Sequence, residues 1–303
     1  MIADLFIVPE SFANNNAFTV EQIEDKVKSL SNDFIEIRKF KSTNRIYVHS
    51  DIYNVSFLNG LTIGDLLYNP EVAKANIDRD VYNALKTIVL ESANAEYTTE
   101  EIIDVLLPGH DEENCYGLIA FDEVPGVDPA FQIIYSLQGW YGFRRHFLGL
   151  YPKNPTFFID ECKNYFPDIF FHERNKETIG AILHNCSKTI IFHLSALNDN
   201  FRANQSTHLN RTEVLLQFSI NNHLPEHASL EGNAAHKPNF TFAFMDNKGR
   251  NIEVCCEPHM KLCYNDNYPG DNSYSNERRI YFHEGIPEIQ ENKILVGHIG
   301  GHL

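Results

Sequence analysis

The sequence predicts an α+β fold, in which an acidic region of mixed α/β and helical structure precedes a C-terminal antiparallel β module. The chain has 303 residues, of which 43% are hydrophobic and 12% aromatic, enough to bury a large core. Apolar residues recur at helical spacing over much of the stretch between residues 63 and 198. From residue 240 onward they alternate with polar residues, as in half-buried strands. These changes predict three regions: an acidic α+β region at 1–150, a helical region with a long loop at 151–235, and a β-rich module at 236–303.

The first region is expected to open with a short strand and a helix. Thr19 and Gln22 have the spacing of a capping box, in which each side chain bonds the backbone of the other residue. Alternating stretches and then helical stretches follow. The predicted elements are a strand at 5–8, a helix at 19–30, strands at 34–40 and 45–49, helices at 80–90 and 98–107, and a strand at 116–121.

The second region is expected to be mainly helical. Asn154 and Pro155 are typical of a helix start, and Pro167 limits how far that helix can run. An aromatic helix or helix pair containing Trp140 precedes it. That preceding helix is predicted at 128–150, the helices of the second region are predicted at 154–166, 174–184 and 188–198, and a long loop is predicted at 224–238.

The last region is expected to consist of short strands. A turn at Asp246–Gly249 separates the first two, as in a β-hairpin. The predicted strands are 240–245, 251–256, 255–263, 278–283 and 293–303. In a strand, side chains two residues apart point to the same face.

Histidine, lysine, arginine and tyrosine occupy alternating positions in these last strands. Bases, cations and a phenol on one sheet face are groups that could handle a phosphate without a metal. The residues are His259 and Lys261 on one strand, Arg279, Tyr281 and His283 on the next, and His298 on the last.

The charge is unevenly distributed along the chain. The formal net charge is −16, and residues 1–150 account for −12 of it, with 11 Lys and Arg against 23 Asp and Glu. Such a surface repels nucleic-acid backbones, which argues against an extended DNA-binding face. It suits a basic partner, so we expect a protein partner to dock on the acidic N-terminal half.

The composition favours a cytoplasmic protein with no membrane span. No stretch approaches the roughly 18–20 apolar residues that a membrane-spanning helix needs. The first ten residues carry Asp4 and no basic lead-in, unlike a secretory signal. Six cysteines without an export signal are expected to be free thiols.

The C-terminal strands resemble the sheet of RelE/ParE-type toxins. The resemblance rests on Arg279-Ile-Tyr-Phe282, followed after a short excursion by Lys293-Ile-Leu-Val-Gly-His298. It covers about residues 240–303, a fifth of the chain. That family normally has helices before its sheet and a strongly basic surface, whereas this segment is net acidic. Some of its members are directed at gyrase and are not ribonucleases.

The resemblance implies a metal-independent endoribonuclease that needs no cofactor, within a toxin-like bacterial effector. A base would remove the proton of an RNA 2′-hydroxyl, cations would stabilise the transition state, and an acid would protonate the leaving oxygen. The roles implied are His259 or His283 as the base, Lys261 and Arg279 as the cations, and Tyr281 or His298 as the acid.

Three other interpretations stay open. The polar face could simply pair charges on a solvated sheet. The chain could be a non-catalytic interaction subunit of a bacterial antiviral defence or toxin–antitoxin complex. It could also be a zinc-stabilised structural module, although the outer cysteines would lie about 27 Å apart on a straight strand. The zinc ligands would be Cys255, His259, Cys263 and His302.

Overall fold

The structure is a computed structural model that describes residues 1–303 except 14–17, 124–131, 206–207, 233 and 267–273. The chain divides into two compact units, Met1–Arg144 and Arg145–Leu303. Helices combine with parallel and antiparallel strand pairs, which confirms the predicted α+β class. None of the described helices is long and apolar enough to cross a membrane.

The first unit is built on a five-stranded parallel sheet with the strand order β5-β2-β1-β6-β7. Counted along the chain, this is the order 3-2-1-4-5 of doubly wound sheets, in which β1 is central and helices cover both faces. The strands are β1 (Ile2–Ile7), β2 (Asn44–Val48), β5 (Ala93–Asn94), β6 (Asn114–Ile119) and β7 (Ile133–Ile134), with a separate hairpin of β3 (Ser56–Leu58) and β4 (Leu61–Thr62).

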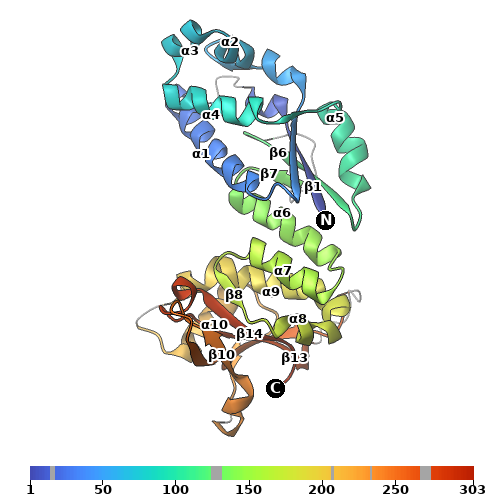
Figure 1. Ribbon diagram of the computed structural model, residues 1–303, viewed down its shortest axis with the longest axis vertical. Coiled ribbons are helices and arrows are strands. Elements are labelled where there is room, and N and C mark those ends of the chain that lie inside the picture. The colour runs from blue at the N-terminus through green and yellow to red at the C-terminus, as the bar shows by residue number, and fades with distance from the viewer. Residues whose placement is uncertain (14–17, 124–131, 206–207, 233, 267–273) are drawn as a thin grey trace. The chain divides into compact units, whose positions relative to one another are not determined.

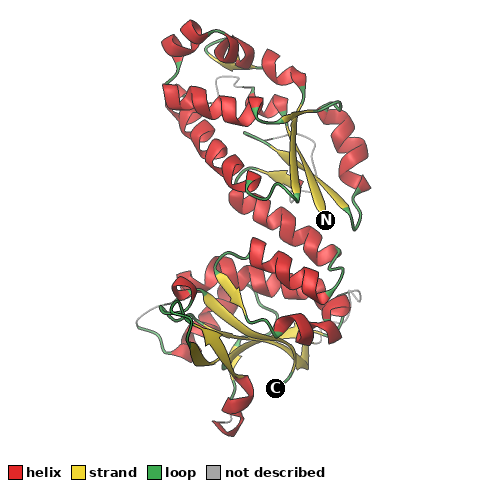
Figure 2. Ribbon diagram, in the orientation of Figure 1, coloured by secondary structure: helices red, strands yellow, loops and turns green. Residues whose placement is uncertain are grey.

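Helices flank this sheet on both sides (Figures 1 and 2). Helix α1 (Val20–Arg38) packs against α4 (Arg79–Leu90) on one side. The capping box of Thr19 and Gln22 opens α1, as predicted. Between α1 and α4 the chain also forms α2 (Ile63–Tyr68) and α3 (Pro70–Asn76).

The strand predicted at 34–40 is wrong, because α1 continues through Arg38. Phe34 and Ile37 are buried three residues apart, while Ile35 between them is 46% exposed. Helical spacing therefore decides which side chains face the core, and the local alternation of apolar and polar residues is incidental.

On the other side of the sheet lies the short helix α5 (Thr99–Glu101), which continues as a π-helical turn at Ile102–Leu106. Buried side chains of this segment join Phe6 and Leu118 of the sheet in one hydrophobic cluster. The helix predicted at 98–107 is thus present, although its second half is wider than an α-helix.

The second unit is built on a mixed sheet with the strand order β8-β14-β13-β12-β9. Its strands are β8 (Ile169–Phe171), β9 (Ser229–Leu230), β12 (Pro258–Cys263), β13 (Tyr274–His283) and β14 (Ile294–Gly301), and its hairpin consists of β10 (Thr241–Met245) and β11 (Asn251–Cys255). The helices are α6 (Leu137–Leu150), which runs through the division between the units, α7 (Pro155–Tyr165), α8 (Asn175–Thr178), α9 (Leu183–Asn204) and α10 (Arg211–Asn221). Of the helix predicted at 128–150, residues 128–131 lie outside the described residues, and the prediction is wrong at Ile133–Ile134, which form β7, so that the helix begins only at Leu137.

The regions predicted at 151–235 and 236–303 belong to one compact unit. Strand β8 comes from the first of these regions and pairs in parallel with β14. Strand β9 comes from the long loop predicted at 224–238 and pairs with β12. The C-terminal sheet is therefore completed at both edges by the segment before it, and it is not purely antiparallel.

The two faces of the second sheet are covered differently. The hairpin β10–β11 packs on the face that carries Tyr281 and contributes to its hydrophobic cluster. The opposite face meets α9, where the rings of Phe201 and Phe282 lie 5.4 Å apart. Polar side chains on the Tyr281 face thus lie beside a hydrophobic cluster.

Candidate functional site

A row of polar side chains crosses four strands of the second sheet. Ser229 of β9 lies opposite His259 of β12, His259 lies opposite Tyr281 of β13, and Tyr281 lies opposite His298 of β14. Directly opposed residues point to the same face of a sheet. The pairing therefore brings together three of the predicted site residues.

The next row on this face carries the two predicted cations. Lys261 of β12 lies opposite Arg279 of β13, which in turn lies opposite Gly300 of β14. A Cβ atom at position 300 would lie 2.9 Å from the Thr178 carbonyl oxygen and 3.0 Å from the His298 ring. Glycine there lets Thr178 and His298 pack closely against the strand.

The centre of the site is Glu231, which sequence reasoning did not single out. The Arg279 guanidinium forms an ion pair with its Oε1 atom. The Tyr281 hydroxyl donates a hydrogen bond to the same oxygen over 3.1 Å. Nε2 of His302 lies 3.4 Å from it and Nδ1 of His259 lies 3.6 Å from it. One carboxylate oxygen thus faces a guanidinium, a phenol and two imidazoles.

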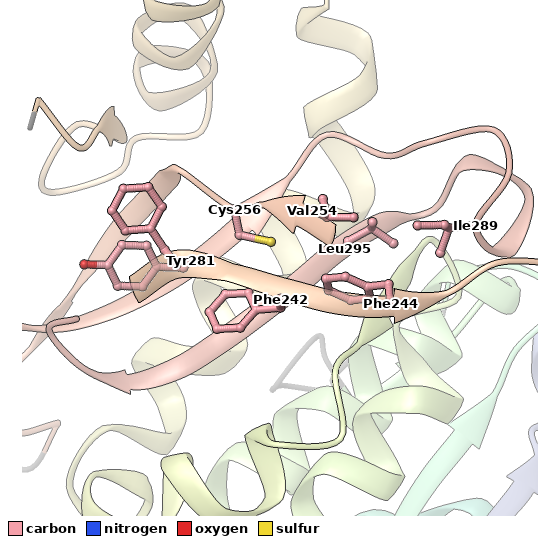
Figure 3. Close-up of a cluster of buried hydrophobic side chains, with 8 residues drawn as sticks. Phe242, Phe244, Val254, Cys256, Tyr281, Ile289 and Leu295 are labelled. Atoms are coloured by element: carbon pink, nitrogen blue, oxygen red, sulfur yellow. The ribbon is translucent and has the colours of Figure 1, made fainter. Parts of the chain in front are cut away.

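Tyr281 connects this polar centre to the hydrophobic cluster beneath the hairpin. Its ring is fully buried and stacks on Phe240 at 6.0 Å with an interplanar angle of 7°. Figure 3 shows the Tyr281 ring at one end of the cluster, with its hydroxyl pointing away from the other labelled side chains. Nη1 of Arg279 also donates to this hydroxyl, over 3.2 Å. The ring is therefore held rigidly and presents its hydroxyl to Glu231 and Arg279.

Two of the predicted histidines are buried and uncharged at neutral pH. Each is only 3% exposed. Burial lowers the pKa of His259 to about 4, opposed mainly by the backbone of Glu257, and lowers the pKa of His298 to about 4 against the carbonyl of Gly301. Nε2 of His259 lies 3.2 Å from the Ser229 hydroxyl, and Nε2 of His298 lies 2.8 Å from the Gly301 carbonyl oxygen. Both rings can position neighbouring groups, and neither is open to a large substrate.

Solvent reaches the site through His302 and Lys261. The His302 side chain is 41% exposed and that of Lys261 is 25% exposed, against 16% for Glu231 and 11% for Arg279. Burial, followed by the charge of Arg279, lowers the pKa of His302 below the usual range of histidine. Nζ of Lys261 lies 3.4 Å from Glu226, an exposed and weak ion pair that a ligand could displace.

His283 does not join this group. Its Nδ1 accepts a hydrogen bond from Gly285 and its Nε2 lies 3.9 Å from Glu284. Glu284 in turn forms an ion pair with Arg211 of α10. His283 therefore lies further along β13, beside Glu284 and Arg211, beyond the point where Gly297 is the extra residue that shifts the β13–β14 register.

The four residues of the zinc alternative are not brought together either. Sγ of Cys263 lies 2.7 Å from the Thr189 hydroxyl and donates to Asp266 over 3.1 Å. Cys255 ends β11 and is partly exposed, while His259 and His302 meet at Glu231. Among the described residues, no group of three or more His, Cys, Asp or Glu side chains is arranged to hold a metal ion.

The site as built can perform acid–base chemistry beside a cationic surface. Glu231 and His302 form a carboxylate–imidazole pair at the solvent-facing end, and Arg279 and Lys261 add positive charge. The sequence offered no signal for Glu231, because only the pairing of β9 with β12 in the fold brings it near His259. No family model matches this sequence, and the searches of curated proteins and of solved structures also gave no match.

Proposed function

We propose that the second unit is a metal-independent endoribonuclease whose reactive groups are His302, Glu231, Arg279 and Lys261. The observation that carries this proposal is the convergence of a guanidinium, a phenol and two imidazoles on one carboxylate oxygen of Glu231. Arg279, Tyr281 and Lys261 belong to this group and are also among the residues that the toxin resemblance implied. We assign the roles of base and acid to His302 and Lys261 because solvent reaches these two side chains.

His302 is the base in this proposal. The proton of an RNA 2′-hydroxyl passes to Nδ1 of the imidazole, whose Nε2–H faces Glu231 at 3.4 Å. A lowered pKa keeps the imidazole unprotonated at neutral pH, as a base must be. Glu231 orients the ring and stabilises the imidazolium as it forms, as a carboxylate does beside a catalytic histidine.

The remaining steps of the reaction need no metal and no cofactor. The 2′-oxygen bonds to the adjacent phosphorus and the bond from phosphorus to the 5′-oxygen breaks, giving a 2′,3′-cyclic phosphate. The leaving 5′-oxygen takes a proton from the Lys261 ammonium. Lys261 then regains a proton from solvent, and the His302 imidazolium releases its proton to solvent. Arg279 stabilises the charge on the phosphoryl oxygens. His259, Tyr281 and His298 hold these groups in place from the buried side of the site.

The test is cleavage of single-stranded RNA in the presence of EDTA. We expect 2′,3′-cyclic phosphate ends, and a loss of rate of about 100-fold or more in His302→Ala, Glu231→Gln and Lys261→Ala. His227→Ala is the matched control, because His227 is an exposed histidine four residues before Glu231. Its rate should equal that of the unmodified protein. The rate should also rise with pH through the pKa of His302.

Two results would count against the proposal. Unchanged cleavage in both His302→Ala and Glu231→Gln would remove the assigned site. If no RNA is cut, the result favours the alternative, a non-catalytic interaction subunit of, for example, a bacterial defence or toxin–antitoxin complex. One observation favours that alternative, since Arg279 and Tyr281 already have Glu231 as a partner.

The acidic first half fits the proposal as a docking or regulatory surface. Its net charge of −12 suits a basic protein partner and repels RNA. A cytoplasmic location would give the site access to RNA, and all six cysteines are free, as is usual in a reducing compartment.

A further inference from the structure

A pocket of about 360 Å³ lies on the sheet of the first unit, on the face that α5 and the π-helical turn cover only in part. Ligand pockets in proteins begin at about this size. Its lining is aromatic and acidic, and contains no lysine or arginine. The lining residues are Asp4, Phe6, Tyr47, Asn94, Ala95, Glu96, Tyr97, Leu106 and Tyr116.

The floor of the pocket is the carboxylate of Asp4 in the central strand. Its Oδ1 atom is buried and has no hydrogen-bond partner. Nη1 of Arg45 on the neighbouring strand lies 3.9 Å from this oxygen, which is too distant for a hydrogen bond. Burial raises the pKa of Asp4, and Arg45 offsets this only in part. A half-buried carboxylate whose buried oxygen has no hydrogen-bond partner favours a ligand that brings positive charge.

The walls of the pocket are aromatic rings. Tyr47 stacks on Phe6 with ring centroids 5.2 Å apart, so the two rings form a rigid surface. Tyr116 stands beside Asp4 on the adjacent strand, and burial, followed by the Asp4 charge, raises its pKa. Tyr97 is 46% exposed at the mouth. The faces of such rings carry negative electrostatic potential and attract cations.

We propose that this pocket binds a small organic cation, of the alkylammonium or quaternary ammonium class. The ammonium group would lie over Asp4 among Tyr47, Tyr97 and Tyr116, with Glu96 adding negative charge at the edge. An anion would meet two carboxylates and no cation of the lining. A metal ion needs more oxygen ligands than Asp4 provides, and the described residues hold no metal-binding group.

The proposal is tested by titrating the full chain with choline and with 3,3-dimethylbutan-1-ol, using calorimetry. The alcohol has the size and shape of choline but carries a carbon where choline has its charged nitrogen. We expect choline to bind about 10-fold or more tightly than the alcohol. Equal binding of the two compounds, or binding of neither, would overturn the proposal.

Variants separate the pocket from the rest of the surface. Asp4→Asn keeps the shape of the side chain and should weaken choline binding about 10-fold or more, and Tyr97→Ala at the mouth should weaken it about 5-fold. The control is Tyr68→Ala, since Tyr68 is 66% exposed in the same unit and does not line the pocket. Choline affinity that is unchanged in both pocket variants, or lost equally in the control, contradicts the assignment. If Asp4→Asn does not fold, Tyr97→Ala alone decides.

Discussion

Gly297 in β14 has no room for a side chain, because the hairpin packs directly on it. A Cβ atom there would lie 2.3–2.4 Å from ring atoms of Phe242 and 2.9 Å from Sγ of Cys256. Gly297→Ala should therefore lower the free energy of unfolding by about 1–3 kcal/mol, since Phe242 must shift. Urea denaturation measures the loss.

Gly301 at the end of the same strand is the matched control. The nearest atom to a Cβ built there is the Glu277 carbonyl oxygen, 3.9 Å away, and the residue is exposed. Gly301→Ala should change the stability by less than about 0.5 kcal/mol. Equal losses in the two variants would mean that the hairpin does not rest on Gly297.

Individual residues also show where prediction of the site from sequence stops. Arg279 and Tyr281 could be placed together from their spacing of two, because both lie on one regular strand. Glu231 could not, since 28 residues separate it from His259 and only the pairing of β9 with β12 brings it near. The exposure of the histidines could not be predicted either, because nothing in the local sequence indicates that His298 is buried and that His302 is accessible.

At the scale of elements, local signals succeeded where one periodicity dominates a segment. The hairpin β10–β11 and the helix at 79–90 appear where alternation or helical spacing predicts them. The prediction failed at 34–40, where a short helical stretch also alternates, and for β8 and β9, which are too short to show a period. Such short strands form because a neighbouring edge needs hydrogen-bond partners, which is a property of the fold.

Helix α9 supplies a prediction at this scale. It kinks at Cys186, whose φ and ψ are −137° and 31°, and its main part restarts one residue later. Asp266, from a distant loop, caps this restart by accepting hydrogen bonds from the amides of Lys188 over 2.6 Å and Thr189 over 3.2 Å. Asp266→Ala should cost about 1–2 kcal/mol of unfolding free energy.

Asparagine tests whether capping is the cause. Asp266→Asn keeps one acceptor oxygen, and asparagine caps helices about as well as aspartate. Its NH2 group replaces the other oxygen, so the hydrogen bonds from Lys188 over 2.6 Å and Thr189 over 3.2 Å, which two different oxygens accept, cannot both be kept. It should retain part of the stability in urea denaturation. A loss in Asp266→Asn as large as that in Asp266→Ala would show that one acceptor oxygen is not enough to cap the restart.

At the scale of the whole molecule, the two units are expected to respond to acid in opposite ways. The second unit buries three histidines, His193, His259 and His298, and burial lowers the pKa of each to about 4. In the first unit burial raises the pKa of Asp4 and Asp33. Lower pH also reduces repulsion among its excess carboxylates.

The sign follows from which state binds more protons. Between pH 6.5 and 4 the unfolded chain protonates the three histidines while the folded second unit keeps them neutral. Their contribution to stability is therefore complete above about pH 6.5 and falls by up to about 4 kcal/mol per pH unit as the pH drops toward 4. Asp4 and Asp33 act in the other direction, because the folded first unit holds their protons more tightly than the unfolded chain does.

Urea denaturation of the full chain at pH 7 and pH 5 checks this expectation. Trp140, the only tryptophan, packs near Phe40 and Asn44 of the first unit, so its fluorescence reports that unit. Far-UV circular dichroism reports both. At pH 5 an early dichroism transition should separate from the fluorescence transition, and His193→Gln should reduce the pH dependence of that early transition by about a third. Dichroism and fluorescence transitions that keep the same spacing at both pH values would show that the buried histidines do not control the stability of the second unit.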